Sequence, residues 1–416
     1  MSARNWEDCI ALPRIRGTYH ESVVVCGASM RLAAAAAIAV SLAGCGLGGA
    51  PQTAGQTPAQ TAPAPASIAG LSPYYGSYVT AAGDTIVIAR LGWFFDMQSS
   101  AYRTIYAGQS SGQFTIGCRF LVPLPKCADL AFTQDVLTVR DTSHSMTVGH
   151  RVANVTTDVS IPAQGAQLAG TITEPPGAGP RGGIVIIHGS EPGQRYFYDI
   201  WVGLYTSLGL AVLTYDKRGN GDSTGRYPGE FPTSDALQTY ADDASAALAL
   251  LARSPGIDAR KVGFHGGSQG GWTVPLAISR HPGAAFAILV SAPATTVDQT
   301  DQWAGYSGGG SFMPSQSNDE MLAAVRATHT GYDPLPALRV LSIPTLWLLG
   351  TNDRTVPTAA CVEILSGLHK TNFTVQMLPT GHGLLVNPTG LMADDDRSPG
   401  LAPELVPKIA SWLHAM

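Results

Sequence analysis

Six near-continuous apolar runs lie between about residue 154 and residue 416, and stretches with helical spacing separate them. The apolar runs cover 184–187, 210–215, 262–265, 286–290, 345–349 and 373–378. The helical stretches cover 237–252, 271–279, 359–368 and 403–414. Apolar runs of this length are typical of strands buried on both faces of a parallel sheet. With the alternating hairpin 155–173 before them, they predict an α/β fold with a mostly parallel central sheet, flanking helices and right-handed crossovers over residues 153–416.

A different pattern covers residues 71–152, where short β-like runs are separated by Gly, Asp and Ser. The runs lie at 85–90, 113–117, 136–140 and 145–148. They predict a small β-rich domain in front of the α/β domain. Trp93, Phe94 and Phe95 are expected in its core, because large aromatic side chains are usually buried. Cys118 and Cys127 bracket a Pro-rich turn and could close a hairpin disulfide, the alternative being two free buried thiols.

The first 45 residues have the pattern of an export leader. Met30 and Arg31 precede the apolar stretch 32–41, which is too short to span a membrane. Leu42-Ala43-Gly44-Cys45 resembles the bacterial lipobox, and this resemblance implies that Cys45 is lipidated and becomes the mature N-terminus. Residues 1–29 would make a long n-region containing acidic residues, so Met30 is a candidate for the true start. An Ala-rich core helix is the alternative for 32–41.

Residues 46–70 are rich in Pro, Gln, Thr and Ala and contain almost no large apolar side chain. Such a segment cannot bury enough surface to order itself, so we expect a disordered linker. Together with the leader, it predicts an exported lipoprotein that is anchored in a membrane and faces the periplasm or the cell exterior.

Candidate chemistry begins at Ser268, in the sequence Gly266-Gly267-Ser268-Gln269-Gly270. It follows the predicted strand 262–265 and precedes a predicted helix, which is the context of a nucleophile elbow. The turn holds its serine in a strained conformation, and side chains on the neighbouring glycines, including Gly266 and Gly270, are expected to clash. In a chain with 47 glycines, the motif by itself is weak.

An acid and a base follow later strands in the order that serine hydrolases of this topology require. Asp353 lies in the loop 350–357 after an apolar run, and His382 lies between Gly381 and Gly383 after the last predicted strand. A serine hydroxyl needs such a base, and the base needs an acid that orients it. Asp222 and Asp333 are weaker alternatives for the acid.

These segments resemble the α/β-hydrolase superfamily over roughly the last 260 residues. Ile187-His188-Gly189-Ser190 is similar to the superfamily's oxyanion loop. The resemblance implies that the backbone N–H groups of Ser190 and Gln269 hold the oxyanion. It also implies that His188 and Gly189 shape this loop, and His188 is not expected to be the base.

The segment Asp216–Ser223 resembles the Asp-x-Arg-Gly-x-Gly-x-Ser loop of the superfamily. The resemblance implies that Asp216 and Arg218 are scaffold residues, held by carboxylate–guanidinium pairing. The chain is also similar to prolyl oligopeptidase-like and serine aminopeptidase-like groups, in which an N-terminal β domain sometimes gates access to the site.

A serine nucleophile indicates acyl chemistry, and we expect hydrolysis of a small carboxylic ester through an acyl-enzyme. The alternatives are a serine peptidase acting on short peptides and a non-catalytic anchored binding protein. Residues 292–341, here called the lid segment, lie between two predicted strands where this fold often carries a lid. The aromatic side chains and Met313 of this segment could line a substrate pocket or cover the edge of the sheet: Trp303, Tyr306, Phe312, Met313 and Tyr332.

Composition removes several other classes of function. The formal net charge is −5 and no block of Lys and Arg occurs, so nucleic-acid binding is not expected. No His, Cys or Asp cluster has the spacing of metal ligands. The Gly-rich segment 305–310 lacks the order of a dinucleotide-binding loop. We therefore expect neither a metal nor a cofactor.

Overall fold

The computed structural model describes residues 70–108, 110–229 and 232–416. The predicted leader, the lipidation site Cys45, the alternative start Met30 and the linker 46–70 lie outside the described residues, apart from Gly70. None of the helices in these ranges has both the length and the apolar character needed to cross a membrane.

Residues 155–378 contain an eight-stranded sheet that is parallel from β11 to β16 and antiparallel at one edge. Its order is β16-β15-β14-β13-β11-β12-β10-β9. The strands are β9 (Val155–Ala163), β10 (Ala166–Glu174), β11 (Arg181–Ile187), β12 (Ala211–Tyr215), β13 (Ile257–Gly267), β14 (Ala287–Val290), β15 (Thr345–Gly350) and β16 (Phe373–Leu378). This confirms the predicted α/β fold.

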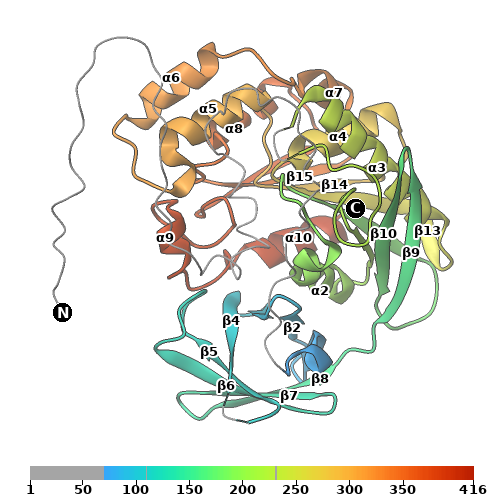
Figure 1. The fold of residues 1–416 in the computed structure, drawn as a ribbon, viewed down its shortest axis with the longest axis vertical. Coiled ribbons are helices and arrows are strands. Elements are labelled where there is room, and N and C mark those ends of the chain that lie inside the picture. The colour runs from blue at the N-terminus through green and yellow to red at the C-terminus, as the bar shows by residue number, and fades with distance from the viewer. Residues whose placement is uncertain (1–69, 109, 230–231) are drawn as a thin grey trace, which may run out of the picture. The chain divides into compact units, whose positions relative to one another are not determined.

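Both faces of the central strands are covered, and alternate residues of one strand enter two different cores. On β11, Val185 and Ile187 pack in a cluster with α3, α4, α7 and α8, whereas Ile184 and Ile186 pack in a cluster with α2 and α10. The helices are α2 (Asp199–Ser207), α3 (Ser234–Arg253), α4 (Gly270–Arg280), α5 (Val297–Ser307), α6 (Asn318–Ala327), α7 (Leu335–Val340), α8 (Thr358–Gly367), α9 (Met392–Asp395) and α10 (Leu405–His414) (Figure 1). The strands β12, β14 and β15 are buried at every position, whereas most side chains of the edge strand β9 are exposed.

The predicted hairpin turn at 162–165 is shorter than expected. Pro162 lies inside β9 and is paired with Gln167, so only Gln164 and Gly165 form the turn. Gly165 has a φ of 72°, which favours glycine. A proline is tolerated in β9 because this is an edge strand of the sheet and its missing N–H breaks no central ladder.

The N-terminal domain is a closed barrel in which each strand pairs with the next and β1 pairs with β8. Its strands are β1 (Gly76–Thr80), β2 (Thr85–Ala89), β3 (Trp93–Asp96), β4 (Ala101–Ala107), β5 (Gln113–Gly117), β6 (Lys126–Thr133), β7 (Val136–Asp141) and β8 (Met146–Arg151). The sequence patterns indicated β2, β5, β7 and β8. Closure through β1 and β8 joins the two ends of the domain, so local pattern gave no sign of it.

The aromatic strand β3 is buried on both sides, which explains its unusual composition. Phe94 points into the barrel core, whereas Trp93 and Phe95 belong to the cluster that includes Ile184 and Ile186 of the α/β sheet. Successive side chains of a strand point to opposite faces. The barrel is therefore packed against the α/β domain by the same strand that fills its interior.

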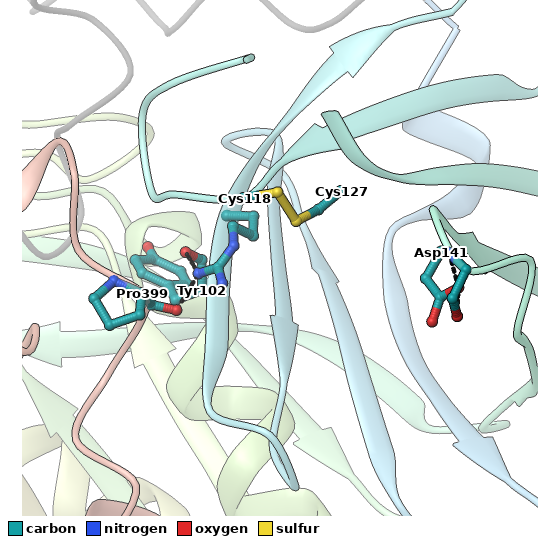
Figure 2. The surroundings of a disulfide bond; sticks show 7 residues. Tyr102, Cys118, Cys127, Asp141 and Pro399 are labelled. Atoms are coloured by element: carbon teal, nitrogen blue, oxygen red, sulfur yellow. Dashed lines mark hydrogen bonds between the residues drawn. A yellow bond between two sulfur atoms is a disulfide. The ribbon is translucent and has the colours of Figure 1, made fainter. Parts of the chain in front are cut away.

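Cys118 and Cys127 form a disulfide that closes the loop between β5 and β6, with their Cα atoms 4.8 Å apart (Figure 2). The hydrogen bond from the N–H of Cys118 to the carbonyl of Pro125 spans the same loop, at 3.0 Å. Phe120 and Leu121 in this loop donate backbone N–H groups to the carbonyls of Ser398 and Asp396. The bridge thus stabilises a loop that contacts the α/β domain.

Removing this bridge should destabilise the protein. A cross-link over a separation of nine residues stabilises by restricting the unfolded chain, by about 2 to 3 kcal/mol. We expect dithiothreitol to lower the denaturation midpoint of the wild type by an amount that corresponds to this loss of free energy of unfolding. The double variant Cys118→Ser/Cys127→Ser should have the lower midpoint from the start and show no response to dithiothreitol. The expectation is contradicted if dithiothreitol does not change the midpoint of the wild type and the variant has the same midpoint as the wild type.

Candidate active site

Ser268 occupies a sharp turn between β13 and α4, with a φ of 48°. Its N–H donates to the carbonyl of Val290 at 3.1 Å, and its carbonyl accepts from the N–H of Gly271 at 2.7 Å. A serine in the left-handed region is strained, and the surrounding bonds keep it there. This is the geometry expected of a nucleophile elbow.

The glycines at the elbow differ in how closely other atoms approach them. A Cβ on Gly266 would lie 2.9 Å from Cγ2 of Val274 and would need a shift, as predicted. On Gly267 and Gly270 the nearest atoms outside the adjacent residues would lie at 3.6 Å, which is ordinary contact. Gly271 is the other crowded position, since its Cβ would lie 2.7 Å from Cβ of Ala292. The close approach is between α4 and the segment after β14.

The three residues predicted as nucleophile, base and acid are brought together. The Ser268 hydroxyl lies 3.2 Å from Nε2 of His382, and Nδ1 of His382 lies 2.8 Å from Oδ2 of Asp353. All three residues are at least 92% buried. With a proton on Nδ1, His382 donates to Asp353 and offers Nε2 as the acceptor for the serine proton.

Backbone groups fix the carboxylate of Asp353. Its Oδ1 accepts from the N–H groups of Thr355 and Val356, both at 2.8 Å. The indole N–H of Trp303, from the lid segment, donates to the Asp353 carbonyl at 3.2 Å. Oδ2 therefore stays directed at His382.

Ser291 supports the histidine loop and was missed by the sequence analysis. Its hydroxyl donates to the carbonyl of His382 at 2.6 Å, and its φ is 46°. It directly follows β14, at the same edge of the sheet as Ser268 and Asp353. A polar residue at the carboxyl end of a predicted strand is the one signal that could have found it.

The weaker acid candidates lie elsewhere. Asp222 forms an ion pair with Arg195 at 2.7 Å, and Oδ1 of Asp333 accepts from the N–H of Leu335 at 2.9 Å. Asp353 is the aspartate that hydrogen-bonds His382.

The scaffold residues Asp216 and Arg218 are both buried, but they do not pair with each other as expected. Arg218 forms a two-pronged ion pair with Asp243 of α3. Asp216 accepts from the N–H groups of Arg195 and Asp222, at 2.8 and 2.9 Å. The reason lies in tertiary structure: β12 delivers the two side chains to different neighbours, α3 and the loop after β11.

His188 begins the loop after β11 and is buried. Its ring packs edge-on against Tyr198 and Tyr215, with centroids 5.3 and 4.8 Å apart. Burial, helped by the charge of Lys217, lowers the pKa of His188 to about 3. The ring is neutral near pH 7 and fills space under the loop.

The two expected oxyanion donors lie on loops that follow neighbouring parallel strands, β11 and β13. Among hydrogen bonds within the described ranges, neither the N–H of Ser190 nor that of Gln269 has an acceptor. Gln269 as a whole is only 2% exposed. These N–H groups remain available for a ligand oxygen.

No group of three or more His, Cys, Asp or Glu side chains in the described part of the chain could hold a metal ion. The arrangement at Ser268 needs only protein groups for acyl transfer.

Residues 198–385 match the sequence profile of the Prolyl oligopeptidase family. This range is similar to that family and lies within the α/β-hydrolase fold of the chain. The matched range covers somewhat less than half of the chain and contains Ser268, Asp353 and His382. The chain is accordingly a serine hydrolase. No curated protein matches it in sequence.

Several solved structures are similar to the hydrolase. An esterase of Pyrococcus furiosus is 16% identical, with a TM-score of 0.46 over 63% of this chain and 92% of that one. An esterase of the archaeon Pyrobaculum calidifontis is 19% identical, with a TM-score of 0.44 over 63% and 86%. A dipeptidyl peptidase 4 of Porphyromonas gingivalis is 18% identical, with a TM-score of 0.44 over 81% of this chain and 49% of that one.

Asp353→Asn should cost the hydrolase about 10⁴-fold in kcat with little change in KM. The amide cannot accept from three donors as the carboxylate does, and it favours the wrong tautomer of His382. The control is Asp333→Asn, which should retain wild-type kcat. Equal losses in the two variants would contradict the role of Asp353.

His265 should make the protein sensitive to acid. It is buried on β13, lies 2.8 Å from the hydroxyl of Tyr205, and burial lowers its pKa to about 3. The pKa of His265 is lower in the folded than in the unfolded chain. The contribution of the neutral ring to stability is therefore fully present above about pH 6.5 and is lost as the pH falls toward 3.

In His265→Asn, unfolding below about pH 6 should take up one proton fewer, so stability should fall less steeply by about 1.4 kcal/mol per pH unit. Denaturation midpoints between pH 4 and pH 7 measure this. His329→Asn, at an exposed histidine, corrects for the general loss of an imidazole. Parallel curves for both variants would show that His265 is not the source.

Proposed function

We propose that this serine hydrolase cleaves carboxylic esters through an acyl-enzyme formed on Ser268. The observation that carries the proposal is the hydrogen-bonded series from the Ser268 hydroxyl to His382 Nε2, at 3.2 Å, and from His382 Nδ1 to Asp353, at 2.8 Å. This series provides a nucleophile, a base and a fixed acid in water-poor surroundings.

In the proposed reaction, His382 Nε2 accepts the Ser268 proton as Oγ bonds to the ester carbonyl carbon. The carbonyl oxygen becomes an oxyanion, and the N–H groups of Ser190 and Gln269 stabilise it. The alcohol leaves with the proton from His382. Water then gives a proton to His382 and attacks the acyl-enzyme, and the carboxylic acid is released as Ser268 regains its proton.

Exposed apolar side chains at the tip of the lid segment favour a substrate with an apolar acyl group. Phe312 and Met313 are 54% and 60% exposed, and Met313 Sδ lies 3.3 Å from a guanidinium nitrogen of Arg354, next to Asp353. In contrast, Trp303 is buried with Met321 and Val325 in a small core of the lid, so it acts as cover. Exposed apolar side chains beside the acid loop favour contact with an acyl chain over recognition of a charged peptide end.

A serine peptidase is the second candidate, and the match to the Prolyl oligopeptidase family favours it. The same groups would cleave an amide, with His382 protonating the leaving amine. A non-catalytic binding protein is the third hypothesis, and it offers no reason for a strained Ser268 within hydrogen-bonding distance of His382.

A fluorophosphonate probe tests the enzyme proposal. We expect stoichiometric labelling of the wild type and none of Ser268→Ala, since the probe needs the activated hydroxyl. Ser207→Ala, at a hydroxyl outside the site, is the control and should label normally. Absence of labelling in folded wild-type protein would favour the binding protein.

The substrate class is tested by comparing p-nitrophenyl esters of two to twelve carbons with aminoacyl-p-nitroanilides. We expect kcat/KM to be highest for an ester and to rise with acyl length to an optimum. Phe312→Ser should lower that preference for longer acyl chains without changing the rate on the acetate. Turnover of anilides alone would establish the peptidase instead.

A further inference from the structure

Lys217 is a buried lysine that joins the two loops of the proposed oxyanion hole. It follows β12 and is only 3% exposed. Its ammonium donates to the carbonyl of Gly189 at 2.7 Å, to the carbonyl of Glu191 at 3.2 Å and to Oε1 of Gln269 at 3.0 Å. The first two acceptors belong to the loop after β11, and the third belongs to the residue after Ser268.

The bond to Gly189 determines where the N–H of Ser190 points. The Gly189 carbonyl and the Ser190 N–H belong to one peptide group, which is planar and trans, so the two point in opposite directions. By holding the carbonyl, Lys217 directs the N–H away from itself. The next carbonyl, that of Ser190, accepts from the hydroxyl of Tyr227 at 2.7 Å, so the loop cannot easily rotate.

The ammonium is also a positive charge close to the site. It lies 4.3 Å from the ring centre of Tyr240 and 5.5 Å from that of Tyr227, and Lys217 is almost fully buried. A charged donor on the Gly189 carbonyl polarises that peptide and strengthens its N–H as a donor. The same charge favours a negative oxygen in the transition state over the neutral carbonyl of the substrate.

We propose that Lys217 is the positioning residue of the oxyanion hole, which fixes the Gly189–Ser190 peptide against Gln269 and polarises it. The proposal rests on the function proposed above. It requires that the loss of Lys217 weaken transition-state binding much more than substrate binding.

The test compares Lys217→Met and Lys217→Arg with Lys261→Met, which removes an exposed lysine of β13. With the best ester of the panel, Lys217→Met should lose on the order of 100-fold in kcat, with KM within about threefold. A trifluoromethyl ketone, which forms a tetrahedral adduct with the serine, should bind weaker by the same factor. Lys217→Arg retains the charge and should recover part of kcat, and Lys261→Met should match the wild type.

Each outcome is decisive when the denaturation midpoint is measured alongside. A folded Lys217→Met protein with wild-type kcat, or with equal losses in kcat and in substrate affinity, overturns the role of Lys217 and leaves the hydrolase proposal intact. Failure of the wild type to react with esters, anilides or the fluorophosphonate overturns the hydrolase proposal itself.

If Lys217→Met does not fold, Tyr227→Phe replaces it, because this variant removes a hydroxyl that holds the Ser190 carbonyl, on the same loop that Lys217 holds. A drop of about threefold to tenfold in kcat at constant KM supports the proposal. Unchanged kcat contradicts it.

Discussion

The parallel strands of the α/β sheet are buried on both faces, and this constraint places the chemistry of the protein at one edge. Alternate side chains of strands such as β11 and β14 pack into two different cores, so most polar groups lie at the strand ends. Ser268 directly follows β13 and Ser291 directly follows β14, and Asp353 lies a few residues after β15. Because neighbouring strands are parallel, their carboxyl ends meet, and residues more than 80 positions apart become hydrogen-bonding neighbours.

Beneath this edge lies a set of buried polar groups, most of which have hydrogen-bond partners. Lys217 has three oxygen acceptors, Arg218 pairs with Asp243, and Glu191 accepts from the Tyr198 hydroxyl. Burying such groups without partners would cost several kcal/mol each. Their bonds hold the loop after β11 and the elbow of Ser268 in fixed relation, which is the preorganisation that acyl transfer requires.

The barrel contributes to the same arrangement from outside the α/β domain. Phe120 and Leu121 bind the segment 396–398 through backbone hydrogen bonds, and the N–H of Leu401 donates to the carbonyl of Ser100. Leu401 is also paired with Leu385, three residues after His382. The small domain therefore supports the segment that follows the histidine loop, in addition to covering the apolar face of the sheet with Trp93 and Phe95.

The sequence by itself determined the strands of the α/β sheet, their order along the chain and the three residues at Ser268, Asp353 and His382, because apolar runs and Gly-flanked loops are local signals. Only the tertiary structure decided which partners those residues and their neighbours find. Arg218 pairs with Asp243 and not with Asp216, Ser291 supports His382, and Lys217 joins Gly189 to Gln269. These contacts cross between strands and helices, and barrel closure joins β1 to β8. No periodicity encodes such pairings, since they depend on which elements the buried sheet brings side by side.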